Sequence, residues 1–154
     1  MKQLLILAAL FVSSVGFAQS NTEDIDLIQS LYGMEKKAIV ADFIALSGDQ
    51  ADAFWGLYDA YEMERKSLGK ERIALLEKYA YHYSSLDDAT TDALIKEMNS
   101  LGAKTDKLIS KYYGKMKKSA GVKSAAQFVQ IEAYLLSVTR ASILENIPFI
   151  GELD

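Results

Sequence analysis

Cysteine is absent from this chain of 154 residues, and proline and histidine each occur once, as Pro148 and His82. The lack of cysteine excludes a disulfide framework, a thiol nucleophile and a lipid-bearing cysteine behind a leader peptide. One proline and nine scattered glycines supply too few breakers for the many turns of a β-sandwich, although half of the residues are hydrophobic. The composition therefore predicts an all-α fold in one domain.

The usual marks of catalysis are also missing from the sequence. It contains no Gly-rich phosphate loop, no G-x-S-x-G, no H-E-x-x-H and no Glu-x-x-His pair of the di-iron type. His82 falls at an expected helix end, which favours a capping or exposed histidine; a metal ligand or general base is the alternative. Asp87 and Asp88 are adjacent and share no helix face, so a helix cap is favoured over an acid/base pair. We expect no enzyme, no metal site and no cofactor.

Positive charge is in deficit. The chain has 17 Lys and Arg against 21 Asp and Glu, a formal charge of −4. Because nucleic-acid binding requires a strong excess of cations to neutralise phosphates, we expect no nucleic-acid partner.

The first 18 residues have the order of a secretory signal peptide. Lys2 is followed by an apolar run, residues 4–12, and by Gly16 and Ala18 at the −3 and −1 positions of a cut before Gln19. Ser13 and Ser14 end the run well before the roughly 20 residues that a spanning helix needs. We predict a cleaved signal peptide, residues 1–18, and a mature domain, residues 19–154, that does not insert into the membrane; an uncleaved anchor is the alternative.

Four amphipathic helices are predicted from the spacing of apolar residues. Their expected ranges are about 22–45, Ser47 to about Tyr83, Asp87 or Asp88 to just before Gly121, and about 123–147, where Pro148 ends the last helix. Helices this long leave part of their apolar stripes uncovered. We therefore expect an antiparallel homodimer, with a closed monomeric four-helix bundle as the alternative.

The segment LSGDQADAFWGLYDAYEMER, residues 46–65, combines a helix start with many aromatic side chains. Ser47 at the N-cap and Gln50 at the N3 position fit a capping box, and Leu46 precedes them. Packing in the core or a dimer interface is one role for the aromatic residues, and contact with a bound client is the other. The residues concerned are Phe54, Trp55, Tyr58 and Tyr61. Trp55 lies off the main stripe, so we expect it to be the most exposed of the four.

The third predicted helix carries lysines at steps of three or four residues beside its apolar seam. They are Lys104, Lys107, Lys111, Lys115 and Lys118. Complementarity to the helix dipole and solubility account for such a stripe. The alternative is a charged rim that attracts acidic, partly unfolded chains.

On these residues the chain resembles the Spy/CpxP superfamily of bacterial envelope proteins, whose hallmark is an L-T-x-x-Q motif at the start of a long helix. Residues 46–50, LSGDQ, resemble that motif with Ser in place of Thr, and the F-W-x-x-Y-x-x-Y-x-x-E-R that follows resembles the next helix, particularly in the divergent sensor-like branch. The resemblance implies a thin, cradle-shaped antiparallel homodimer in the periplasm. Family members act as ATP-independent chaperones, inhibitors of envelope-stress kinases or metal sensors; the metal branch uses histidine-rich sites, which this chain lacks.

The leading hypothesis is therefore a periplasmic chaperone-like binding protein of the stress response, which holds unfolded or aggregation-prone clients. The first alternative is a regulatory protein of the same fold that binds a membrane sensor or an anti-sigma partner, and the second is a helical structural protein.

Overall fold

The computed structural model describes residues 22–152, with side chains from residue 32 onward. The predicted signal peptide, residues 1–18, lies outside this range. The elements are α2 (Thr22–Phe43), α3 (Asp49–His82), a 3₁₀ turn η1 (Tyr83–Ser85), α4 (Asp88–Ser119) and α5 (Val122–Leu144). Residues 22–152 thus form four helices and no strand, which confirms the predicted all-α class and the helix ranges to within a few residues.

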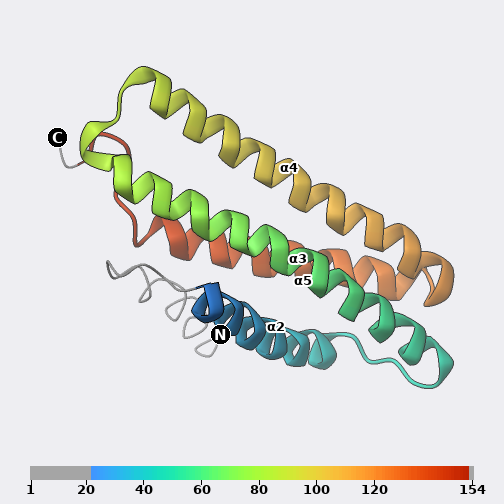
Figure 1. Ribbon diagram of the computed structural model, residues 1–154. Helices are drawn as coiled ribbons and strands as arrows, with labels where there is room; N and C mark the ends of the chain where they lie inside the picture. Colours follow the sequence, from blue (N-terminus) through green and yellow to red (C-terminus); the bar gives the residue numbers. More distant parts are fainter. Residues whose placement is uncertain (1–21, 153–154) are drawn as a thin grey trace.

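The four helices run alternately up and down (Figure 1). Helix α3 packs along α4, α4 also packs against α5, and α2 covers α3 and α5. With 34 and 32 residues, α3 and α4 are longer than α2 and α5, which have 22 and 23. The long hairpin of α3 and α4 is therefore the frame on which the shorter helices lie.

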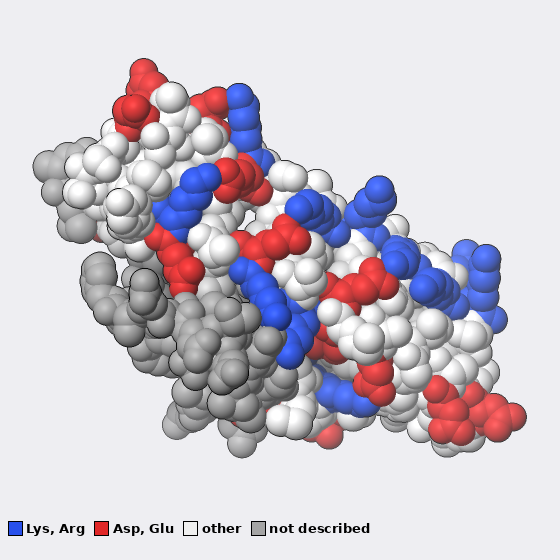
Figure 2. All heavy atoms as spheres, in the orientation of Figure 1, with Lys and Arg blue, Asp and Glu red and all other residues white. Residues whose placement is uncertain are grey.

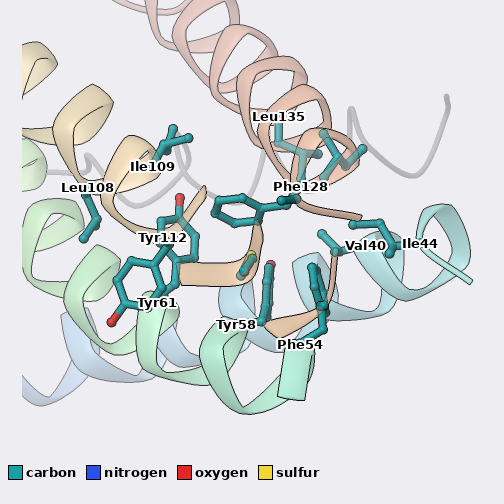
Figure 3. Close-up of a cluster of buried hydrophobic side chains, with 14 residues drawn as sticks. Val40, Ile44, Phe54, Tyr58, Tyr61, Leu108, Ile109, Tyr112, Phe128 and Leu135 are labelled. Atoms are coloured by element: carbon teal, nitrogen blue, oxygen red, sulfur yellow. The ribbon is translucent and has the colours of Figure 1, made fainter. Parts of the chain in front are cut away.

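The main hydrophobic core is concentrated at one end of this frame. It is formed by the last turns of α2, the first turns of α3 and α5, and the C-terminal half of α4 (Figure 3). Phe128 lies between two tyrosines of α3, with ring centroids 6.3 Å from Tyr58 and 5.0 Å from Tyr61, both edge to face. Tyr112 of α4 lies 5.5 Å from Tyr61. These large rings fill the space between the helices with favourable edge-to-face contacts.

The start of α3 differs from the prediction. The N-cap is Gly48, not Ser47, and it has a φ of 61° and no side-chain hydrogen bond to the helix. Ser47 and Gln50 are exposed, and Leu46 packs against the core. The capping-box prediction for Ser47 and Gln50 is therefore wrong: the positive φ, which glycine adopts without strain, places the turn one residue later.

The start of α4 agrees with the prediction. Asp87 is the N-cap, and its Oδ1 accepts a hydrogen bond of 2.7 Å from the Thr90 backbone N–H. At the far end Lys117 and Lys118 occupy the last turn, and Gly121, with a φ of 90°, follows the C-cap Ala120. Acid at the start, base at the end and glycine beyond it satisfy the free backbone groups and the helix dipole.

These two helix starts give a direct test. Asp87→Ala should lower the melting temperature, whereas Ser47→Ala should change the free energy of unfolding by less than about 0.5 kcal/mol. Hydrogen bonds from Thr90 lower the pKa of Asp87. The Asp87 contribution is therefore present above the pKa of the unfolded state and is lost as pH falls through the lower folded pKa. Thermal melts at pH 7 and in acid check this; an equal loss in both variants at pH 7 would contradict the assignment of the caps.

The C-terminal segment crosses the other end of the frame. The Tyr79 hydroxyl donates a hydrogen bond to the Pro148 carbonyl at 2.7 Å, and the Tyr83 hydroxyl donates to the Phe149 carbonyl at 2.8 Å. This segment therefore lies against the end of α3, at the turn into α4 (Figure 1).

Candidate functional site

Three of the four aromatic residues expected to contact a client are inside the protein. Phe54 and Tyr58 are 0% exposed and Tyr61 is 1% exposed. Trp55 is half-buried, with its ring centroid 5.0 Å from Phe54, and Lys37 Nζ lies 5.6 Å above it. For Phe54, Tyr58 and Tyr61 the packing role is therefore confirmed and the alternative of client contact is wrong. Trp55 is the most exposed of the four, as predicted. The apolar face of α3 is wide here because α2, α4 and α5 all cover it.

The five lysines of α4 are exposed, but they are not equivalent. Lys104 bonds to Glu71 at 2.6 Å and Lys111 to both carboxylate oxygens of Glu64 at 2.7 Å, so these two connect α4 to α3. Figure 2 shows blue side chains along the C-terminal half of α4 with red carboxylates beside them. Among the described side chains no ion pair engages the remaining three, Lys107, Lys115 and Lys118. Lys115 instead lies 4.6 Å from the Tyr112 ring centroid. The stripe therefore consists partly of helix-to-helix ion pairs and partly of lysines without a carboxylate partner among the described residues; below, Lys107, Lys115 and Lys118 are called the free lysines in this sense.

A buried cluster of charged side chains connects α2, α3 and α5 beside the aromatic core. Lys36, 2% exposed, donates hydrogen bonds of 2.6 Å to Glu62 Oε1 and 2.7 Å to Glu132 Oε2. The Tyr61 hydroxyl donates to the same Glu132 oxygen at 2.6 Å, and Arg65 Nε donates to Glu62 Oε2 at 2.8 Å. Two cations thus face two carboxylates, and the cluster has no net charge.

The two tyrosine hydroxyls of the buried region keep their protons. Burial, with the Glu132 charge next in size, raises the pKa of Tyr61 far above its usual range, and burial and Glu62 do the same for Tyr58. The Tyr61 hydroxyl therefore remains a donor to Glu132 at any physiological pH. Two buried oxygens, the Tyr58 hydroxyl and Glu132 Oε1, have no hydrogen-bond partner within the part of the chain that the structure describes. The charged groups are mostly shielded from solvent and are paired with one another. We infer that they hold the helices in register and do not transfer protons to a substrate.

A cavity of about 60 Å³ adjoins the buried cluster. Its wall combines three cations and the Glu132 carboxylate with hydroxyl-bearing and apolar residues from all four helices: Tyr32, Lys36, Tyr61, Arg65, Leu68, Gly69, Arg72, Thr105, Ile109, Glu132, Leu135, Leu136 and Thr139. The Tyr32 hydroxyl and Thr139 Oγ1 are 3.3 Å apart across it. The cavity exceeds the space that a single water requires.

Large apolar side chains are exposed at both ends of the frame: Phe43 and Val122 lie near the main core, and six others lie toward the opposite end. Met98 belongs to the apolar seam of α4 yet is 52% exposed, and Ile95 beside it is 39% exposed. The other large apolar side chains that are exposed near this end are Tyr81, Leu144, Phe149 and Ile150. We call these six residues the apolar end. Met98 is exposed although Leu94 and Leu101, which precede and follow it on α4, are buried.

A second apolar surface is an open groove of about 590 Å³ between α4 and α5. Its walls consist mainly of small and medium side chains: Asp106, Ile109, Ser110, Tyr113, Ala126, Val129, Gln130, Ala133, Leu136, Ser137 and Arg140. Ile109 of this groove belongs to the main core, and Tyr113 and Val129 pack against it, so the groove borders the core.

The buried cluster was not predicted from the sequence, although a signal for it is present there. Lys36 falls four residues after Tyr32 and four before Val40, and Glu132 falls four residues after Phe128. Charged residues in register with an apolar stripe must be buried with it, and buried charges require partners. What the sequence could not show is which charges on different helices meet.

Comparison with protein families, with curated proteins and with solved structures gives no match to this chain. Over residues 22–152, none of the helices has the length and apolar character that crossing a membrane requires. The same part of the chain contains no group of three or more His, Asp or Glu side chains placed to hold a metal ion.

Proposed function

We propose that the chain is a non-catalytic binding protein of the periplasm, an ATP-independent chaperone-like dimer that holds unfolded or aggregation-prone segments. The observation that carries this proposal is the exposure of Met98, a seam residue of α4, within the apolar end. Exposed apolar surface of this kind marks a place where other apolar chains bind. Methionine is well suited to varied clients because its side chain is flexible and polarisable.

The free lysines of α4 supply the second part of the proposal. Lys107, Lys115 and Lys118 have no carboxylate partner among the described residues, and they lie along the same helix as Met98. A cationic edge speeds the encounter with acidic chains, and salt weakens that effect. The buried aromatic residues support the frame and do not form the binding surface in this proposal.

The proposed second copy has a place to bind in the α4–α5 groove. The groove is lined by apolar and polar residues, and among them Ala126 and Ala133 are small enough to allow close approach of another helix. Binding there would leave the apolar end open to clients.

An aggregation-suppression assay paired with light scattering tests the proposal. Equimolar dimer should slow the aggregation of an unfolded acidic client, more strongly at low salt, and light scattering should give a dimer mass at micromolar concentration. Met98→Glu should weaken suppression several-fold because it places a charge in the apolar end. Ala103→Glu, which adds the same charge at another exposed position of α4, is the matched control.

Unchanged aggregation rates at every salt concentration would refute client binding. Equal loss in the Met98→Glu and Ala103→Glu variants would show that the apolar end is not the binding surface, and a monomer mass throughout the micromolar range would refute the dimer.

A further inference from the structure

Among the described residues that line the cavity between the four helices, three are cationic, Lys36, Arg65 and Arg72, and one, Glu132, is acidic. Lys36 and Arg65 are matched by Glu132 and Glu62 at distances of 2.6–2.8 Å. Arg72, which also lines the cavity, has neither an ion pair nor a hydrogen bond to any described side chain. Among the described side chains, no carboxylate pairs with Arg72.

A second arginine, Arg140, forms no ion pair with any described side chain. Arg140 of α5 reaches across to α4, where its Nη2 would be 3.9 Å from a Cβ placed on Gly102. Asp106 shares the α4–α5 groove with Arg140 but forms no ion pair with it in the described structure. Burial, and then the positive charge of Arg140, lower the pKa of Arg72. The two guanidinium groups are thus close enough to repel each other.

This arrangement is costly unless an anion completes it. A guanidinium does not lose its proton in proteins, so it cannot avoid the cost of partial burial by becoming neutral. Its flat fork of donors matches the oxygens of a carboxylate or a phosphate. The cavity beside Arg72, at about 60 Å³, has room for a small group of atoms but not for a large cofactor.

We propose that this cavity is a binding site for a small oxyanion, a phosphate or a carboxylate, held by Arg72 with Arg140 and Arg65 supplying further positive potential. Gly69 and Thr105, which line the cavity together with Arg72, have small side chains and leave space for the anion. The bound anion would join α3 to α4 and α5 at the point where the apolar core gives way to charged residues. The site lies inside the frame and does not depend on client binding at the apolar end.

Thermal melts with different sodium salts at matched ionic strength test this site. Phosphate or acetate should raise the melting temperature in a saturable manner, whereas chloride should not. A larger rise with phosphate would indicate a phosphate site, and a larger rise with acetate would indicate a carboxylate site. Arg72→Gln should weaken the apparent affinity at least tenfold, and Lys107→Gln, an exposed cation of α4, should leave it unchanged. The same melting temperature in all three salts, or an equal response in the Arg72→Gln variant, would overturn the proposal.

Two further variants keep the test decisive if Arg72→Gln folds poorly. Arg140→Gln removes an exposed guanidinium and should reduce the affinity several-fold without loss of fold. Arg72→Met should be at least as stable as the wild type in chloride, because it removes an unneutralised charge, and should not respond to phosphate or acetate. A large loss of stability for Arg72→Met in chloride would instead show that Arg72 is a structural residue and would overturn the site.

Discussion

Replacing Lys36 with Met is expected to lower the free energy of unfolding by about 3–5 kcal/mol, because it leaves a buried carboxylate without its cation. Lys36 is the only residue that bonds to both Glu62 and Glu132 among the described side chains. After its removal Glu62 retains Arg65, but Glu132 retains only the Tyr61 hydroxyl. Urea denaturation followed by circular dichroism gives the free energy, provided that the slope with denaturant stays constant.

Two further variants separate the buried pair from a general effect of losing a lysine. Lys37→Met removes the adjacent lysine, whose pair with Asp59 has side chains 41% and 57% exposed, and should cost at most about 1 kcal/mol. Lys36→Met combined with Glu132→Gln should recover most of the loss, because a neutral amide still accepts from Tyr61 and no lone charge remains. If the two lysine variants lose the same stability, or if the double variant loses the sum of its parts, the buried cluster does not behave as a coupled pair.

Replacing Phe128 with Ala is expected to cost about 3–5 kcal/mol through lost burial and the cavity left behind. Phe128 is 0% exposed and its ring is edge to face with both Tyr58 and Tyr61. Because those rings come from α3 and Phe128 from α5, the surrounding helices cannot close the space without separating from α2 and α4. The midpoint of urea unfolding should fall with little change in the slope.

Tyr134→Ala is the matched control for this variant. Tyr134 lies on the same helix but is 46% exposed, so its truncation should change the free energy by about 0.5 kcal/mol. Equal losses for the two variants would mean that the aromatic cluster is not the source of stability at this end of the frame.

The helices could be predicted from the sequence because their signals are local. The spacing of apolar residues depends only on neighbours within a turn or two, and so do the helix start signal Asp87 and the helix end signals Gly121 and Pro148. The start of α3 was predicted one residue early because two local signals competed, a serine suited to capping and a glycine suited to positive φ. Gly48 adopts that conformation, and the side chain of Ser47 is left exposed.

The candidate site could be predicted only in part because it depends on contacts between distant segments. That Phe54, Tyr58 and Tyr61 share a stripe was evident, but which helices cover this stripe is a tertiary property. Similarly, regular spacing found the lysines of α4 but could not show that Glu64 and Glu71 of α3 engage two of them. The cavity with Arg72 brings together residues from four helices, and no local pattern marks it.

The chaperone hypothesis depends on a resemblance in residues 46–65, and the fold changes how those residues contribute. A short sequence signature can have a local origin, and here its aromatic part forms the core of the frame while its first residues form a turn. A variant at Trp55 or Tyr58 would therefore alter stability before it altered binding. The α4 surface, with Met98 and the free lysines, is the better place to separate the two effects.

Because the buried core is concentrated at one end of the frame, the two ends are expected to differ in how easily they open. Local opening costs least where few apolar side chains are buried, and it approaches the cost of global unfolding where many are. Apart from Leu94, Leu101 and Ile143, the buried apolar residues belong to the cluster around Phe128. The end formed by the α3–α4 turn and the C-terminal segment is therefore the part that can fray reversibly while the aromatic end stays folded. Amide protons would record this as exchange that slows along α3 from His82 back toward Phe54.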